Sequence, residues 1–235
     1  MKNPPCQGII EESIELDVVD STNTYALDAG RPGLLVTALS QSLGRGRRGR
    51  TWFSPAGENL YMTVTLAPPE ERYPIIAGVA VREALAELLD SVGVAVKWPN
   101  DIVIAGKKVC GILCETRGGI TAVGVGVNVN QTSWPEDLAH RAISLRQTSH
   151  RRFSFDEVKD TVIVHLSRWL ERFFHQGFGP VRDEFLRYGL LEGYEVSTEE
   201  GERCTIKDLD MEGRLVIDVS GSPRSLRYET ISLSW

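Results

Sequence analysis

The chain has 235 residues, of which 42% are hydrophobic and 25% charged, and its formal net charge is −6 at neutral pH. This composition is typical of a globular protein large enough for one large domain and one smaller domain. The acidic balance argues against general nucleic-acid binding, which favours broad basic surfaces. Residues Met1–Cys6 lack the apolar region of a signal peptide, and no apolar run reaches the about 18 residues of a membrane span. We therefore expect a cytoplasmic protein with no membrane partner.

The four cysteines are the next constraint: Cys6, Cys110, Cys114 and Cys204. They contain no Cys-x-x-Cys pair, and no other ligand-type residues stand around them at metal spacing, so we expect no zinc site. Free, buried thiols in a reducing cytosol are the expected state.

The N-terminal part predicts a strand, a short helix and a second strand. Ile14–Val19 is strand-like, and the Asp20–Asn23 segment is rich in residues that cap helix N-termini. A helix over Thr24–Ala29 is expected to end at Gly30. The next strand covers 34–39. The hydroxyls of the Asp20–Asn23 segment can cap this helix, and they can also form the polar corner of a pocket.

Positive charge is concentrated in the segment Gly44–Arg50, which places four arginines and three glycines in seven residues. The glycines let the backbone approach an anion closely, and arginine offers bidentate hydrogen bonds to phosphate or carboxylate. We interpret this segment, called the arginine loop below, as a phosphate-handling loop. A solvated basic loop without a ligand is the alternative.

The arginine loop also matches the G-x-G-x-x-G pattern of dinucleotide-binding sites. That pattern must open a helix whose N-terminus holds the pyrophosphate. Here Pro55 disfavours a helical conformation at Ser54, and Gly57 follows closely. The next expected element is a strand over Leu60–Leu66. The context therefore argues against a dinucleotide site.

The middle of the chain predicts one core helix followed by short strands. Apolar residues recur at helical spacing over about 74–91. A strand that starts at Val94 stops at Pro99, directly before Asn100 and Asp101. Further strands are expected over Ile102–Ile104, Val109–Cys114 and Ile120–Val129. Gly124 and Gly126 share one face of the last strand, so a ligand or another backbone can lie flat against it.

The C-terminal part predicts two helices and then a small β-rich unit. Trp134–Asp137 is a predicted turn, and Ser154–Glu157 is a capping box that opens a helix running to about His175. His165 lies on the apolar side of that helix, so we interpret it as structural. A shorter helix covers Val181–Tyr188. Short strands with glycine-containing turns then follow at 195–198, 204–208, 215–219 and 226–233.

These features make the chain similar to the biotin–protein ligases. The similarity covers most of residues 19–130, in the order in which that family has its motifs. The matching stretches are Asp20–Asn23, Gln41 with Gly44–Arg50, Trp52–Pro55, Asn59–Tyr61, Lys97–Asp101, Lys108 with Gly111–Leu113, and Gly124-x-Gly126-x-Asn128.

The resemblance implies an α+β fold with a mixed β-sheet and flanking helices, like the catalytic domain of class II aminoacyl-tRNA synthetases. A small C-terminal SH3-like β-barrel is expected to follow. The implied division is a catalytic domain over 1–188 and a small β domain over 189–235.

The resemblance also implies an ATP-dependent ligase that works with Mg²⁺ in two steps. The carboxylate of biotin attacks the α-phosphate of ATP, which gives biotinyl-5′-AMP and pyrophosphate. A lysine of a biotin carboxyl carrier protein then takes the biotinyl group as an amide. A lipoate or octanoate ligase of the same fold and a non-catalytic anion- or nucleic-acid-binding module are the alternatives.

Three sets of site residues follow from the resemblance. The implied catalytic residues are Arg45, Arg47, Asp101 and Lys108. The implied biotin-binding residues are Ser21, Thr22, Asn23, Gln41, Gly44, Arg45, Gly46, Arg47, Lys108 and Gly111. The implied ATP- or adenylate-binding residues are Arg48, Arg50, Trp52, Lys97, Asn100 and Asn128, and Asp101 is the candidate metal ligand.

These residue types suit the implied chemistry. A cyclic urea offers two N–H donors and one carbonyl acceptor, so hydroxyl and amide partners fit it. Cations offset the repulsion between a carboxylate and a triphosphate. We also expect the arginine loop to be poorly ordered without ligand and to close over the adenylate, which water would otherwise hydrolyse. Because the catalytic pattern begins by about residue 14, we expect no DNA-binding segment and no DNA partner. A homodimer through the face around 118–129 stays open.

Overall fold

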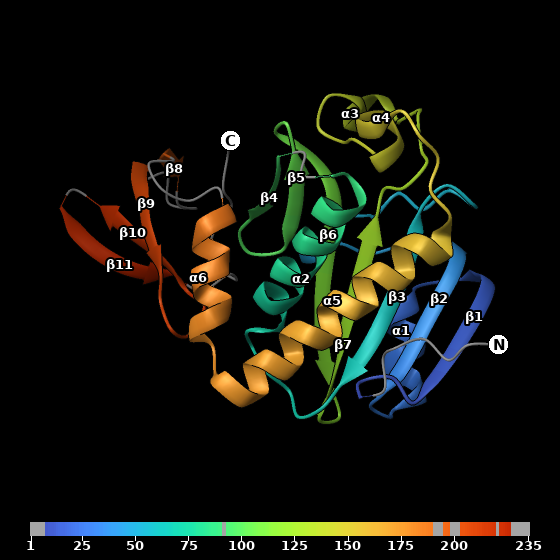
Figure 1. The fold of residues 1–235 in the computed structure, drawn as a ribbon, viewed down its shortest axis with the longest axis horizontal. Coiled ribbons are helices and arrows are strands. Elements are labelled where there is room, and N and C mark those ends of the chain that lie inside the picture. Colours follow the sequence, from blue (N-terminus) through green and yellow to red (C-terminus); the bar gives the residue numbers. More distant parts are fainter. Residues whose placement is uncertain (1–7, 91–92, 190–194, 198–202, 220, 227–235) are drawn as a thin grey trace.

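The computed structural model describes residues 8–90, 93–189, 195–197, 203–219 and 221–226 (Figure 1). Its centre is a seven-stranded sheet with the strand order β1-β2-β3-β7-β6-β5-β4. The strands are β1 Glu12–Val19, β2 Leu34–Gln41, β3 Leu60–Leu66, β4 Val94–Lys97, β5 Asp101–Ile104, β6 Lys107–Arg117 and β7 Ile120–Val127. The sheet is mixed, because β1 runs parallel to β2 while every other neighbouring pair is antiparallel.

Helices cover both faces of this sheet. On one face, α2 (Tyr73–Leu88) and α5 (Phe155–Gln176) pack against each other, with α6 (Gly179–Tyr188) beside them (Figure 1). On the other face, α1 (Thr22–Ala29) packs Ala26 against Leu34 and Val36 of β2. Because side chains alternate along a strand, Leu35 between them points to the larger core under α2 and α5. β3 is therefore buried along its whole length.

The predicted elements are present with shifted ends. The helix predicted over 24–29 begins at Thr22, and the one predicted over about 74–91 covers Tyr73–Leu88. Gly30 ends α1 in the left-handed conformation, as predicted. Ser21 is the N-cap residue by backbone position, but its side chain makes no capping hydrogen bond, so the predicted capping role was wrong.

One short helix overlaps the predicted turn, and a second short helix follows it. The segment Trp134–Asp137 leads into α3 (Glu136–Ala139), and α4 (Leu145–Ser149) follows. Ser144 and Gln147 form a reciprocal capping box at the start of α4. Ser154 accepts a hydrogen bond from the backbone of Glu157 at the start of α5, which is one half of the predicted capping box, while the Glu157 carboxylate accepts from Arg151.

A second, four-stranded antiparallel sheet follows α6, with the order β11-β10-β9-β8. Its strands are β8 Glu195–Ser197, β9 Arg203–Leu209, β10 Leu215–Val219 and β11 Ser222–Leu226. It lies beside α6 at one end of the molecule (Figure 1). The antiparallel arrangement agrees with the expected barrel-like C-terminal domain. Most of the strand predicted over 226–233 falls outside the described residues. The domain boundary at 188/189 stays a prediction, which the change from helices to a separate antiparallel sheet after α6 supports.

Within the described ranges, no helix is both long and apolar enough to cross a membrane. Cys110 and Cys114 are free thiols, Cys204 is buried, and Cys6 lies outside the described residues. Burial raises the pKa of the Cys110 and Cys114 thiols. These groups therefore stay protonated and unreactive at neutral pH.

Candidate active site

One open cavity of about 980 Å³ brings the predicted site residues together. Of the residues named from the sequence, all except Gly44 line it. They come from the start of α1, the end of β2, the arginine loop with Trp52 after it, strands β4 to β6 with the β4–β5 turn, and the residue after β7. Motifs spread over more than 100 positions of the chain thus meet at one place.

The floor of the cavity consists of two neighbouring rows of residues across the sheet. One row pairs Thr63, Gly124 and Leu113, and the next pairs Tyr61, Gly126, Gly111 and Asp101. Glycine occupies the central strand in both rows. A Cβ atom at Gly124 would collide with the side-chain amide of Asn23. The glycines therefore make room for side chains that arrive from other elements.

Trp52 fills the second row. Its indole lies against Gly126 and Gly111, where an added Cβ atom would come within 2.6 Å and 2.9 Å of the ring. Lys108 Nζ lies 5.2 Å from the ring centroid, a cation–π distance. The flat object that the glycine pattern predicted is thus an indole, which is neither a backbone nor a ligand. The indole N–H is buried and has no hydrogen-bond partner among the described residues.

A chain of hydrogen bonds fixes the pocket corner between α1 and β2. The Thr22 backbone N–H donates to Gln41 Oε1 at 2.9 Å, and Gln41 Nε2 donates to Ser54 Oγ at 3.1 Å. Ser54 Oγ in turn donates to the carbonyl oxygen of Trp52 at 2.9 Å. Gln41 is therefore oriented at both ends and keeps one N–H on Nε2 for a ligand.

Asn23 is fully engaged with the protein. Its Nδ2 donates to the carbonyl of Leu113 at 3.1 Å and to Glu115 Oε2 at 2.8 Å. Its Oδ1 accepts from Thr63 Oγ1 at 2.7 Å. Both N–H groups of the amide are thus used, so the geometry favours a supporting role for Asn23 over donation to a ligand.

Cations gather at the opposite end of the cavity. Lys108 Nζ lies 2.6 Å from Asp101 Oδ1, and Arg47 donates to Asn100 Oδ1 at 3.2 Å. The Lys108–Asp101 contact has the distance of an ion pair but lacks hydrogen-bond alignment, since Asp101 Oδ1 has no aligned donor. Burial lowers the pKa of Lys97 to about 8; Asp101 opposes this shift, while Lys108 and Arg50 add to it. An anion placed here would relieve this crowding of positive charge.

The arginine loop has a compact backbone. Gly46 N–H donates to the carbonyl of Arg50 at 2.7 Å, and Arg45 forms a β-bridge with Thr51. Arg48 adopts a left-handed conformation with φ 56° inside a single 3₁₀ turn. No helix opens after the loop, which agrees with the argument against a dinucleotide site.

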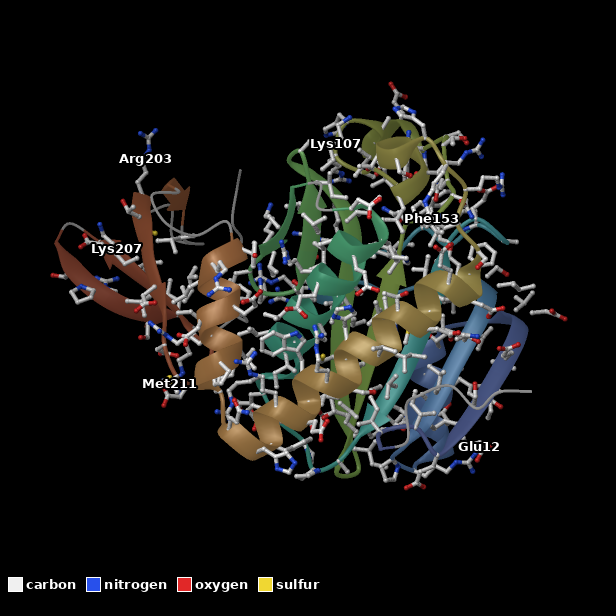
Figure 2. The ribbon with its side chains drawn as sticks, viewed as in Figure 1. Glu12, Lys107, Phe153, Arg203, Lys207 and Met211 are labelled. Atoms are coloured by element: carbon white, nitrogen blue, oxygen red, sulfur yellow. The ribbon has the colours of Figure 1, made fainter. Side chains whose placement is uncertain are left out.

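Asn128 holds the strand that carries Lys108. Its Nδ2 donates to the carbonyls of Lys108 and Ile143, at 3.2 Å and 3.1 Å. The side-chain oxygen remains as its acceptor. The α3 segment docks here as well, because the Lys108 backbone N–H donates to the carbonyl of Arg141 at 2.8 Å. Figure 2 shows the neighbouring Lys107 at the start of β6, close to α3 and α4.

Sequence reasoning missed two parts of the site. One is the α3 wall, which includes Trp134, Leu138 and His140 and reaches the cavity only through the fold. The other is Glu115, which accepts from Asn23 and from Arg45 Nη2, the latter at 2.9 Å. Strand alternation could have found Glu115, because it follows Gly111 and Leu113 at every second position of β6.

Fold and site together define an enzyme-like protein that binds a small anionic ligand. Its cavity has a neutral polar corner at one end and cations at the other. A sequence model of the biotin/lipoate A/B protein ligase family matches residues 15–132. The chain therefore belongs to this family.

Individual relatives agree. The chain is 34% identical over 200 residues to a biotin–[acetyl-CoA-carboxylase] ligase of Paracoccus denitrificans, covering 77% of this chain and 82% of that protein. It is 33% identical over 190 residues to the bifunctional ligase/repressor BirA of Bacillus spizizenii, covering 74% of this chain. The chain spans 58% of that bifunctional protein's length. Among solved structures, the biotin protein ligase of Aquifex aeolicus in complex with biotin and ATP is similar with a TM-score of 0.88, at 29% identity, over 96% of this chain and 99% of that chain.

Proposed function

We propose that the chain is a biotin–protein ligase that activates biotin with ATP and transfers it to a lysine of a biotin carboxyl carrier protein. One observation carries the proposal: a single cavity joins a hydrogen-bonding corner at Thr22 and Gln41 to a cation-rich end at Lys97 and Lys108. Biotin has the matching shape, with a polar urea ring at one end and a carboxylate at the other. The names of the relatives support the same substrate.

The urea ring would lie in the corner formed by Ser21, Thr22 and Gln41. The free N–H of Gln41 would donate to the urea carbonyl, and the hydroxyl oxygens would accept from the urea N–H groups. Because Asn23 and Ser54 hold this corner, its donors and acceptors are oriented before the ligand arrives.

The first step is an in-line attack of the biotin carboxylate oxygen on the α-phosphorus of ATP. A new O–P bond forms as the bond to the departing pyrophosphate breaks. Lys108 and Arg47 would bind the carboxylate and the α-phosphate, so that two anions approach at low cost. Asp101 would hold Lys108 Nζ in place for this contact.

The residues fit a magnesium ion that is bound mainly by phosphates. Among the described residues, no group of three or more His, Cys, Asp or Glu side chains could hold a metal ion alone. Asp101 is a carboxylate at the cation-rich end, and it would contribute one ligand through the oxygen that does not contact Lys108 Nζ. Mg²⁺ is commonly held by one or two carboxylates together with substrate phosphates, and it offsets their negative charge.

The adenine ring would lie near Trp52 and Asn128. Because Asn128 spends both N–H groups on backbone carbonyls, its oxygen can only accept a hydrogen bond. The amino group of adenine is a donor, whereas guanine carries a carbonyl acceptor at the same place. This arrangement favours ATP over GTP.

In the second step, the carrier lysine attacks the carbonyl carbon of biotinyl-5′-AMP. An amide bond forms, and AMP leaves with the bonding electrons. The arginine loop would cover the adenylate until then, because free access of water would hydrolyse it. We further propose a cytoplasmic location, a homodimer and no DNA partner.

Pyrophosphate exchange into ATP tests the proposal, with biotin, lipoate and octanoate compared in parallel. We expect exchange with biotin alone. Exchange with lipoate or octanoate instead would assign the chain to the other branch of its family. No exchange with any acid would overturn the proposed activation step and favour a non-catalytic binding protein.

A further inference from the structure

Glu115 on β6 joins two parts of the site that are far apart in the sequence. Its Oε2 atom accepts a hydrogen bond from Asn23 Nδ2 at 2.8 Å and another from Arg45 Nη2 at 2.9 Å. Asn23 belongs to α1 at the polar corner, whereas Arg45 belongs to the arginine loop. One carboxylate oxygen therefore connects the corner to the loop.

The position of Glu115 is unfavourable for anion binding by itself. A carboxylate near a cavity for two anionic substrates repels them. Glu115 does not line the cavity, whereas Arg45 and Asn23 both do. The carboxylate thus stands behind the guanidinium, where it can orient the cation without touching the ligand.

We infer that Glu115 is a positioning residue that couples Arg45 to the head-group corner, an inference that rests on the proposed function. Its contact occupies one N–H group on Nη2 of the guanidinium and fixes the plane of the group. The remaining N–H groups of Arg45 stay available to the carboxylate of biotin or to the adenylate. A guanidinium oriented in advance loses less conformational entropy when the anion binds.

The same carboxylate orients the corner. Asn23 accepts from Thr63 Oγ1, which lies 2.8 Å from Thr22 Oγ1, and Thr22 contacts Gln41. A displacement of Glu115 would therefore disturb the urea-binding groups and Arg45 together. Glu115 should determine biotin affinity and retention of the adenylate, although it touches neither.

A double-mutant cycle tests this inference on the full chain. The variants are Glu115→Ala, Glu115→Gln, Arg45→Ala and the double variant Glu115→Ala/Arg45→Ala. Asp28→Asn is the matched control. Asp28 on α1 forms an exposed ion pair at 2.5 Å with Arg117, which lies on β6 like Glu115. For each variant, pyrophosphate exchange gives KM for biotin and kcat, a chase experiment gives the rate of adenylate escape, and thermal unfolding gives Tm.

We expect Glu115→Ala to raise KM for biotin about tenfold and to speed adenylate escape, with kcat changed much less. Glu115→Gln should recover part of the loss, since it retains an acceptor oxygen. The double variant should be little worse than Arg45→Ala, because both changes remove one interaction. Asp28→Asn should behave as the wild type.

Three results would overturn the inference. Unchanged KM and adenylate escape in Glu115→Ala would remove the role, and fully additive losses in the cycle would remove the coupling to Arg45. A lowered Tm with a proportional fall in kcat and unchanged KM would show a purely structural role. Failure of the wild type to exchange pyrophosphate with biotin would instead reject the proposed function, so the two failures are distinguishable.

Discussion

Single residues decide the shape of the cavity floor, and Gly126 shows how. The residue lies on the central strand β7 and is paired with Tyr61 on one side and Gly111 on the other. Its hydrogen atom leaves the space in which the Trp52 indole rests. The indole in turn forms the wall at which the proposed adenine site begins. A glycine here serves a neighbouring side chain, since no turn requires it.

We predict that Gly126→Ala displaces Trp52 and lowers the rate of pyrophosphate exchange at least about tenfold. The physical reason is that the added Cβ atom would lie 2.6 Å from the indole, well inside the contact distance of carbon atoms. Tryptophan fluorescence should change as the indole moves. Gly179→Ala is the control, because a Cβ atom at that position meets open space. Wild-type exchange in Gly126→Ala would contradict this account of the floor.

At the scale of elements, the arginine loop carries the next expectation. Arg47 donates to Asn100, so it links the loop to the β4–β5 turn across the cavity. Loss of this link should open the cover over the adenylate. We predict that Arg47→Gly releases biotinyl-5′-AMP several-fold faster and increases biotin labelling of unrelated lysines. A stopped-flow chase measures the release, and an unchanged rate would count against a covering role.

The expected disorder of the loop without ligand is still a prediction. Limited proteolysis at the loop arginines, with and without biotin plus ATP, measures it directly. Slower cleavage with ligands is expected, because closure would protect these peptide bonds.

The packing of α2 against α5 contains a charged cluster that should respond to pH. His165 contacts Glu83 through Nδ1 at 3.1 Å and Glu87 through Nε2 at 2.8 Å, while Arg168 and Trp169 also donate to Glu83. The hydrogen bond to Glu83 is the main cause that raises the pKa of His165, and Glu87 adds to it against burial. Burial opposes ionisation of Glu83, yet the bonds from His165, Trp169 and Arg168 lower its pKa to about 2.

The sign of each effect sets the pH window. The raised pKa of His165 stabilises the fold fully below about pH 6.5, and this contribution is lost as pH rises through the folded pKa. The lowered pKa of Glu83 stabilises the fold above about pH 4.5, and this contribution is lost as pH falls toward 2. The cluster should therefore stabilise most between these two limits.

We predict that His165→Gln lowers Tm at pH 6 and that the deficit shrinks as pH rises toward 9. Thermal unfolding across that range measures the difference from the wild type. His175→Gln is the control, because His175 is exposed near the end of the same helix. A deficit that stays constant with pH would show that only packing was lost.

At the scale of the whole molecule, the second sheet is attached to the first through identifiable contacts. Arg182 on α6 holds both carboxylate oxygens of Asp208 at 2.7 Å. The Trp98 indole N–H donates to the carbonyl of Gly213 at 3.3 Å, in the turn between β9 and β10. Trp98 precedes the segment of Asn100 and Asp101, so the small sheet supports one wall of the cavity from outside.

We predict that Trp98→Phe destabilises the protein by about 1 to 3 kcal/mol, because the buried Gly213 carbonyl loses its donor while most of the packing stays. Denaturant unfolding measures this change. Trp169→Phe is the matched control, since its buried indole donates to Glu83 within the larger unit and does not line the cavity. Equal effects of the two changes on both stability and pyrophosphate exchange would argue against a specific role of the contact between the sheets.

Much of the fold could be predicted from local patterns. Strand β3 matched its predicted range because a run of β-branched and aromatic residues is bounded by clear breaks. The end of α2 was overestimated, because apolar spacing continues through Leu89 while the helix stops at Leu88. The α3 segment was read as a turn, since proline and acidic residues suit a turn and a helix start equally well.

The residues around the cavity could be named from motifs, but their partners could not. Asn23 donates a hydrogen bond to Glu115, although the two residues are far apart in the sequence. A local sequence pattern cannot predict a contact over such a separation. The glycine pair predicted a flat neighbour, yet only the fold identifies it as Trp52. Long-range side-chain contacts depend on the path of every intervening element.

The outer strand β1 bears on how two copies of the chain could meet. It forms one edge of the large sheet, and within the described ranges β2 is its only strand neighbour. Glu12, Glu15 and Asp17 are exposed along it. Glu12 pairs with Arg31, and Glu15 pairs with Lys159. The edge therefore carries a row of charged side chains, which oppose the addition of a further strand. The charged edge thus acts against continuous growth of the sheet and leaves a symmetric pair, if one forms, to a different surface.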